Sequence, residues 1–209
     1  KVSESLFQFM NLLIALLMKN GQYRTSLHYR ATLNSFKRYR DNKDIALSVI
    51  DADVMHSYEV YLHHTAKVCS NTSSFYLRIL RATYNKAVAK GLTPQQHPFR
   101  EVYTGIAQTR KRAISTESVS QIKRLESVKE LSPKEEMARD TFLMSFYLRG
   151  ISFIDLAHLR KSDLKDEYLH YTRSKTGQRL TIRWEKEMQE LLEKYQAQTV
   201  TSPYLFPFL

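Results

Sequence analysis

Apolar residues recur at helical spacing through the first half of the chain, and capping signals divide that half into four amphipathic helices. The first helix spans about residues 4–19. A second helix is capped by Thr25 or Ser26 and continues to about Arg40, and Asp51 caps a third. The pattern therefore predicts a helical first half.

A fourth helix opens at Asn71 or Thr72 and ends before Gly91, because glycine tolerates the left-handed conformation that closes many helices. We expect the second helix to turn Leu33 and Phe36 inward. The apolar sets of the third and fourth helices are Val54, Tyr58, Tyr61 and Leu62, then Phe75, Leu77, Ile79, Leu80, Tyr84 and Val88. The apolar run at residues 12–18 is too short to cross a bilayer, and we interpret it as part of a buried core helix.

Capping signals also organise the second half. Ser115 caps a short helix that ends near Glu130, and Ser132, followed by Pro133, opens another helix through a capping box. That second helix ends around residues 149–150. We expect it to turn five side chains toward the core, namely Met137, Phe142, Leu143, Phe146 and Tyr147.

Ser152 and Asp155 repeat the capping pattern in the next helix, where we expect Asp155 to bond the free amides of the first turn. The period of the apolar positions then changes from helical to alternating. This change predicts two strands, residues 168–173 and 178–184, which a hairpin loop at residues 174–177 connects.

Residues 185–196 return to a helical pattern, and an aromatic, extended tail at residues 203–207 follows with no closing element. A length of 209 residues suits two domains of about 100 residues, each able to bury a core. We divide the chain into a helical domain (1–107), a basic linker (108–116) and a mixed α/β domain (117–209). The predicted fold class is mainly α with a small β-hairpin.

Cysteine and histidine usage points away from metal chemistry. The one cysteine, Cys69, cannot form an internal disulfide, and the seven histidines are scattered without the spacing of metal ligands. We therefore expect no metal and no cofactor. No signal peptide or membrane-spanning run is visible, so the cytoplasm is the expected location.

The chain carries a net charge of +11, which favours a polyanionic partner through counterion release and electrostatic steering. Residues 1–112 hold 17 Lys+Arg and 7 Asp+Glu, whereas residues 113–209 hold 15 and 14, so the first half carries almost all of the excess. This distribution predicts double-stranded DNA as the partner. A basic protein with no nucleic-acid role is the alternative that charge alone leaves open.

Basic side chains on two helices and in the linker are candidates for DNA-backbone contact. The candidates are Arg30, Lys37, Arg38 and Arg40 on the second helix, Arg78, Arg81 and Lys86 on the fourth, and Arg110, Lys111 and Arg112 in the linker. A basic helical face is also typical of a helix that is merely solvated, and a basic linker can be a solvated loop. Repetition on two helices in a domain with few acids favours phosphate contact.

Two further cations are presented from different elements of the second half. Arg149 stands at a helix end, and Lys175 stands on the hairpin turn. Arg173 and Arg179, on either side of that turn, are further candidates for DNA binding. Considered alone, Arg149 can be a partner of the helix dipole, and Lys175 can be an ordinary exposed lysine. Together, two fixed cations can grip a phosphodiester and stabilise charge that develops on it. The pair therefore predicts a site for a nucleic-acid backbone.

The order of these features resembles the phage-integrase, or tyrosine recombinase, family. The likeness rests on the basic four-helix domain, the Arg-Lys-Arg linker, the helix with Arg149, the Phe-Ile-Asp-Leu-Ala-His-Leu helix and the Arg-Ser-Lys-Thr-Gly-Gln hairpin. The pattern most resembles integrases of mobile elements in Bacteroides-type bacteria. The resemblance implies a SAM-like core-binding domain, followed from about residue 113 by the N-terminal part of the integrase catalytic domain.

The resemblance also implies roles for single residues. Arg149 would bind nonbridging oxygens of the cleaved phosphate, and Lys175 would protonate the leaving 5′ oxygen, with Ser152 and Asp155 as structural support. The family usually places its arginine three residues before the acidic residue. Here Ser152 occupies that position and Arg149 stands six residues before Asp155. An upstream residue, Arg139, is a weaker substitute.

In this family, strand exchange proceeds through a 3′-phosphotyrosyl intermediate without metal or ATP. The resemblance implies a tetrameric synapse on DNA for the full-length protein and a monomer in isolation. The His-x-x-Arg segment and the nucleophilic tyrosine of the family would lie beyond Leu209, so we expect this chain to bind DNA without cleaving it. The alternatives are a DNA-binding regulator or accessory module that does no chemistry, and a helical scaffold for protein interactions.

Overall fold

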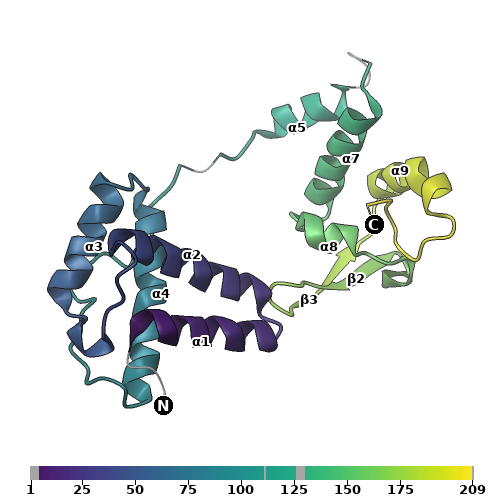
Figure 1. Ribbon diagram of the computed structural model, residues 1–209. Coiled ribbons are helices and arrows are strands. Elements are labelled where there is room, and N and C mark those ends of the chain that lie inside the picture. The colour runs from purple at the N-terminus through teal and green to yellow at the C-terminus, as the bar shows by residue number, and fades with distance from the viewer. Residues whose placement is uncertain (1–4, 111, 126–129, 209) are drawn as a thin grey trace. The chain divides into compact units, whose positions relative to one another are not determined.

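The computed structural model describes residues 5–110, 112–125 and 130–208. The chain divides into two compact units, Lys1–Arg110 and Lys111–Leu209, and each is described by itself. The first unit contains α1 (Leu6–Lys19), α2 (Tyr23–Tyr39), η1 (Leu47–Val49), α3 (Ala52–His64) and α4 (Ser70–Ala89) (Figure 1). The predicted four-helix order is confirmed.

Local signals set most of the helix ends in the first unit. The Ser5 hydroxyl caps α1 by accepting from the N–H of Gln8, and the Asp51 carboxylate caps α3. Gly21 and Gly91 follow α1 and α4 with φ of 72° and 70°, the left-handed region that glycine enters without steric cost. These ends are readable from the sequence because each depends on neighbouring residues alone.

Two predicted helix starts are wrong. Helix α2 begins at Tyr23, so Ser26 lies inside it and donates its hydroxyl to the Tyr23 carbonyl. The chain reverses so tightly after α1 that the next helix starts before the expected cap. Helix α4 begins at Ser70 after Cys69, and the Asn71 side chain, an expected cap, is bound elsewhere in the unit.

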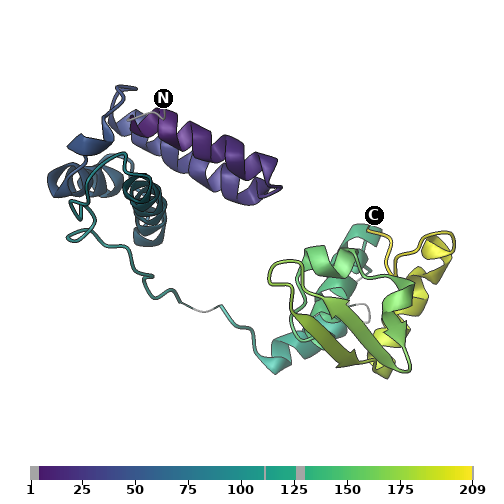
Figure 2. The same cartoon turned by 90° about the horizontal axis from the view of Figure 1, so that it is seen from below.

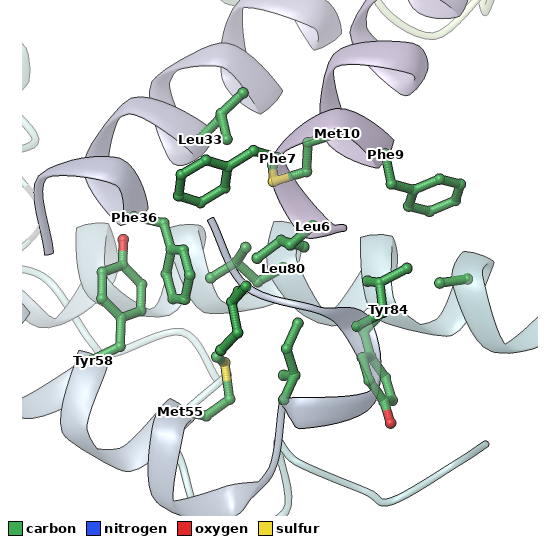
Figure 3. Close-up of a cluster of buried hydrophobic side chains, with 14 of the residues drawn as sticks. Leu6, Phe7, Phe9, Met10, Leu33, Phe36, Met55, Tyr58, Leu80 and Tyr84 are labelled. Atoms are coloured by element: carbon green, nitrogen blue, oxygen red, sulfur yellow. The ribbon is translucent and has the colours of Figure 1, made fainter. Parts of the chain in front are cut away.

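Side chains from all four helices converge on one core in the first unit (Figure 3). Phe36 and Tyr58 are fully buried there, and the Tyr58 hydroxyl donates to the Ser35 hydroxyl at 2.8 Å. Burial raises the pKa of Tyr58 well above its ordinary value. The apolar run at residues 12–18 is only partly buried: its periodicity places Leu13 and Ile14 in the core and leaves the rest at or near the surface.

The segment after α4 folds back along that helix. The Tyr84 hydroxyl donates to the Pro94 carbonyl at 2.9 Å, and the Ser74 hydroxyl donates to the Gly105 carbonyl. Asn71 exchanges two hydrogen bonds with the backbone of Ala107, at 2.8 and 3.2 Å. Residues up to 107 are therefore fixed to α4, although the break in helical pattern starts at residue 92.

The second unit combines helices with a small antiparallel sheet. Its elements are α5 (Thr116–Lys123), α7 (Pro133–Tyr147), α8 (Phe153–Ala157), η2 (Lys161–Asp163), β1 (Leu164–Lys165), β2 (Tyr168–Thr172), β3 (Arg179–Arg183), α9 (Lys186–Tyr195) and η3 (Gln196–Thr199). The predicted capping box at Ser132 is present, and Pro133 is the first residue of α7. Helix α5 ends at Lys123, before the expected end near Glu130, and residues 126–129 lie outside the described part of the chain.

The sheet has the strand order β1-β2-β3 (Figure 2). Leu169 pairs with Ile182, and both side chains are buried in the core of the unit. The alternate residues, such as His170 and its partner Thr181, are exposed. Strand β1, which has only two residues, was not predicted because so short a strand has no period to detect.

Two packing expectations for this unit are wrong. Phe142 and Phe146 are 37% and 48% exposed, because α7 instead turns Arg139 and Asp140 into the interior. The aromatic tail also closes against the unit: Leu205 is buried and donates its N–H to the Leu159 carbonyl at 2.9 Å. Apolar side chains in the tail gain more from burial than from an extended, solvated path.

Candidate nucleic-acid interface and phosphate site

The first unit carries positive charge that ion pairs among its described residues do not compensate. Within described residues 5–110, no lysine or arginine lies within 4.0 Å of a carboxylate oxygen. The acids there are used differently: Asp44, Asp51 and Glu59 each accept from a backbone N–H. The cations of this unit therefore remain available to an external polyanion.

Several of these cations are nevertheless held in place by neutral groups. Lys37 Nζ lies 5.4 Å from the ring centroid of Phe7. Lys86 Nζ lies 5.4 Å from that of Tyr29 and donates to the Tyr29 hydroxyl at 3.3 Å, which connects α4 to α2. Such contacts orient a cation without cancelling its charge.

The other predicted DNA contacts differ in exposure. Arg30, Arg38 and Arg81 are exposed, whereas Arg40 and Arg78 are half-buried, and the Nε atoms of both are buried without a partner. In the linker Arg110 and Arg112 are exposed, and Lys111 lies outside the described residues. The structure thus leaves at least three helical arginines open to solvent.

Arg149 follows the last turn of α7 in a left-handed conformation, with φ of 58°. Gly150 is also left-handed, and its N–H donates to the Ser145 carbonyl at 2.8 Å, so the two residues form the cap of α7. An L-residue in this region costs about 1 kcal/mol or more relative to its ordinary conformation. The Arg149 side chain is exposed, and no described group binds it.

Asp155 connects α8 to the hairpin loop. Its buried carboxylate accepts from the Ser174 N–H at 2.9 Å and from the Ser174 hydroxyl on one oxygen, and from the Ser152 hydroxyl at 2.7 Å on the other. The expectation that Asp155 bonds first-turn amides is wrong, because the Ser152 hydroxyl accepts the Asp155 N–H instead. Burial alone would raise the pKa of Asp155, but the hydrogen bonds from Ser174 and Ser152 outweigh it and lower that pKa.

Lys175 immediately follows the residue that Asp155 holds. The loop is closed by two 2.8 Å backbone bonds, from Arg173 N–H to the Gln178 carbonyl and from Gly177 N–H to the Arg173 carbonyl. Lys175 itself is exposed, and no described group binds its side chain. A fixed backbone therefore presents a free ammonium group.

Hydrogen bonds among Ser152, Asp155 and Ser174 connect the two segments that carry the predicted catalytic cations. Arg149 stands three residues before Ser152, and Lys175 stands one residue after Ser174, while Asp155 bonds to both serines. The upstream alternative, Arg139, is buried and forms a 2.7 Å ion pair with Asp140. Arg139 therefore serves the core of the unit.

A cleft of about 610 Å³ lies between the α8–η2 segment and the hairpin. Its lining includes Asp155 and Arg179, together with three residues that sequence reasoning did not select: His158, Arg160 and His170. The alternation along β2 could have pointed to His170, since it shares the exposed face with Thr172. His158 and Arg160 had no such signal, because their place beside the hairpin depends on tertiary packing.

None of the helices in the described part of the chain combines the length and apolarity that a bilayer-spanning segment needs. Its histidine, cysteine, aspartate and glutamate side chains form no group of three or more that could hold a metal ion.

Comparisons with known proteins agree with the division into two units. Residues 5–103 match the family described as the phage integrase SAM-like domain. No curated protein sequence matches the chain. Seventeen solved chains are similar in structure, and those named below have low sequence identity to this chain.

One similar structure is a lambda integrase tetramer bound to a Holliday junction, with a TM-score of 0.73, 18% identity, and coverage of 97% of this chain and 57% of the integrase. Another is a lambda integrase dimer bound to a core site, with a TM-score of 0.73, 19% identity, and coverage of 97% and 70%. A third is the integrase of transposon Tn1549 in complex with a circular intermediate DNA, with a TM-score of 0.67, 11% identity, and coverage of 93% and 66%.

The chain thus spans a little over half the length of the lambda integrase in the tetramer. At identities of 11–19% the likeness is one of fold, and that fold is the predicted one, a helical domain followed by part of a mixed α/β domain. Residues 5–103 thus match the phage integrase SAM-like domain, and the chain as a whole has a fold similar to that of the integrases named above.

Proposed function

We propose that this chain is the DNA-binding part of a site-specific tyrosine recombinase, of the kind that integrates or excises a mobile element in Bacteroides-type bacteria and works in the cytoplasm. The first unit supplies the electrostatic support, because none of its described cations is neutralised by an ion pair. Lambda integrase and the Tn1549 integrase are each bound to DNA in the similar structures.

The observation that carries the proposal is the attachment of the hairpin loop to α8 by Asp155. The carboxylate holds Ser174 through two hydrogen bonds, so the backbone beside Lys175 is fixed relative to the turn that bears Arg149. Phosphoryl transfer depends mainly on positioned positive charge, and a fixed loop supplies it without reorganisation during the reaction.

We assign Arg149 to the nonbridging oxygens of the cleaved phosphate and Lys175 to the leaving group. In the proposed reaction a tyrosine hydroxyl loses its proton to solvent and its oxygen attacks phosphorus. The bond from phosphorus to the 5′ oxygen breaks, and Lys175 transfers a proton to that oxygen and regains one from solvent. The products are a 3′-phosphotyrosyl bond and a free 5′ hydroxyl. No oxidant, reductant or nucleotide is consumed.

The hydrogen bonds of Ser152 explain why the arginine of the proposed site stands at residue 149. Ser152 occupies the place where the family pattern has arginine, and its hydroxyl is committed to the N–H and carboxylate of Asp155. Arg149 lies three residues earlier, in the non-helical turn between α7 and α8, and its left-handed backbone has a conformation that glycine would adopt more easily. A costly backbone at a free arginine supports a functional role for that side chain.

A complete protein would need a nucleophilic tyrosine from sequence after residue 209, and we propose that it assembles as a tetramer on DNA. Reading the gene past codon 209 is the first test. A downstream Arg-His segment followed by tyrosine supports the recombinase, and a stop codon there supports an accessory DNA-binding module.

The chemistry is tested with the extended protein and a suicide DNA substrate that traps the covalent intermediate. We expect a protein–DNA adduct from the unaltered extended protein. Arg149→Ala should reduce adduct formation by at least about 100-fold, which is the usual scale for removing one transition-state contact. An adduct that forms equally well without Arg149 would contradict the assignment.

A further inference from the structure

The first unit contains a second cleft, separate from the hairpin site, whose side chains carry no carboxylate. It lies between the later part of α4 and the segment that folds back on it, and it has a volume of about 490 Å³. Arg81 and Asn85 line it from α4, and residues 95 and 97–100 line it from the segment.

The segment side of this cleft is built in a fixed conformation. The buried Tyr84 hydroxyl donates to the Pro94 carbonyl at 2.9 Å and accepts from the Gln96 N–H at 3.3 Å. His97 is left-handed, with φ of 51°, and its carbonyl accepts from the Arg100 N–H at 3.1 Å. The residues that face the cleft are therefore positioned before any ligand arrives.

The amide oxygens beside the cleft are already used within the protein. Asn85 Oδ1 accepts from Gln95 Nε2 at 3.4 Å, and Gln95 Oε1 accepts from the His97 N–H at 2.9 Å. The Asn85 amide nitrogen and the Arg100 guanidinium have no described hydrogen-bond partner. Arg81 donates from Nη1 to the Thr104 hydroxyl at 2.8 Å. The cleft therefore offers a ligand unpartnered N–H donors and the positive charges of Arg81 and Arg100.

We propose that this cleft clamps a phosphate of the DNA backbone, an inference that rests on the proposed DNA-binding function. Phosphate oxygens are acceptors only and match the unpartnered N–H donors of this cleft. Adenine and cytosine edges also present amino donors, whereas each of the two amide oxygens here already accepts a hydrogen bond within the protein. A clamp of this kind fixes the register of the protein on the duplex and reads no sequence.

The test compares Asn85→Asp with Asn11→Asp. The first change is nearly isosteric and keeps the Gln95 bond, since a carboxylate oxygen also accepts, but it places a negative charge in the cleft. Asn11 is exposed on α1 and lines no described cleft, so its variant has the same net charge and serves as the matched control. Arg100→Gln is a second variant that removes a donor fork without adding a negative charge.

Dissociation constants are measured on two unrelated duplexes over a range of salt concentrations. We expect Asn85→Asp to weaken binding by about tenfold on both duplexes and to make the log–log salt slope shallower by about 0.9, the value for one phosphate contact. Arg100→Gln should shift the slope in the same direction. Asn11→Asp should leave the slope unchanged.

Each other outcome identifies a different failure. Equal dissociation constants and salt slopes for the Asn85→Asp and Asn11→Asp variants would overturn the proposed clamp and leave the proposed DNA binding intact. A loss confined to one duplex would overturn it in favour of base readout. A difference between the unaltered chain and Asn85→Asp that inorganic phosphate at constant ionic strength did not reduce would overturn phosphate as the ligand, because free phosphate would compete for such a clamp. Absence of binding by the unaltered chain would instead count against the proposed function.

Discussion

The Asp155 carboxylate and Ser174, which are 19 residues apart, are joined by two hydrogen bonds, from the serine N–H at 2.9 Å and from its hydroxyl. This pair attaches the hairpin loop to α8 and fixes the backbone next to Lys175. Its consequences for stability and for the loop can be measured separately from catalysis.

Replacement of Asp155 by Asn should weaken this attachment, because the neutral amide accepts fewer and weaker hydrogen bonds than the carboxylate. We expect the free energy of unfolding of the second unit to fall by about 1–3 kcal/mol, the range for a buried hydrogen-bonded group. Urea denaturation followed by circular dichroism measures the change. Asp166→Asn, at an exposed turn, is the control and should stay within about 0.5 kcal/mol of the unaltered chain.

The stabilisation by Asp155 should also depend on pH. Its pKa is lowered in the folded chain, so the ionised form is favoured by folding, and the stabilisation is present above the unfolded-state pKa of about 3.9. It is lost as pH falls through the lowered folded-state pKa. The difference in unfolding free energy between the unaltered chain and Asp155→Asn should therefore be constant from about pH 7 to 5 and shrink below about pH 4. A difference that grows on acidification would refute the sign of this shift.

Arg149→Gly should stabilise the second unit, because glycine adopts the left-handed conformation at this position without the steric cost that arginine bears. We expect a gain of about 0.5 kcal/mol or more in the free energy of unfolding. Arg149→Ala removes the same side chain but keeps a left-handed L-residue, and it should show no gain. Equal free energies of unfolding for Arg149→Gly and Arg149→Ala would show that the left-handed backbone of Arg149 carries no steric cost.

Arg139 and Arg149 should respond to substitution in opposite ways. Arg139 is buried and pairs with Asp140, whose second oxygen accepts from the Tyr195 hydroxyl at 2.9 Å. Arg139→Met leaves that buried carboxylate with only Lys194, whose Nζ lies 3.7 Å from its Oδ2, and should cost about 3 kcal/mol in thermal or urea unfolding. The exposed Arg124, changed to Met, is the control. If Arg139→Met hardly changed the free energy of unfolding, Arg139 would again be a candidate for the phosphate ligand.

Features set by neighbouring residues were predictable from the sequence. The Ser132 capping box, the Asp51 cap and the glycine after α4 depend on side chains within one helical turn, and all three are present. The positive charge of the first half is a compositional property, and the sequence shows it directly. The hairpin loop followed from the change of period on either side of it.

Features set by tertiary packing were not predictable. Helical spacing suggested that Phe146 is buried, but the face that α7 turns inward carries the Arg139–Asp140 pair. The capping pattern identified Asp155 as structural, yet its main partner, Ser174, lies on another element and no local rule names it. His158 entered the site for the same reason, through the position of α8 beside the hairpin.

The most direct test of the central claim is the salt dependence of DNA binding by the 209-residue chain, measured by fluorescence anisotropy on a labelled duplex. We predict tight binding at low salt and a linear fall of log K with log salt concentration, with a slope of about −0.9 for each phosphate contact and several contacts in total. Binding that is absent, or that does not change with salt, would contradict the account.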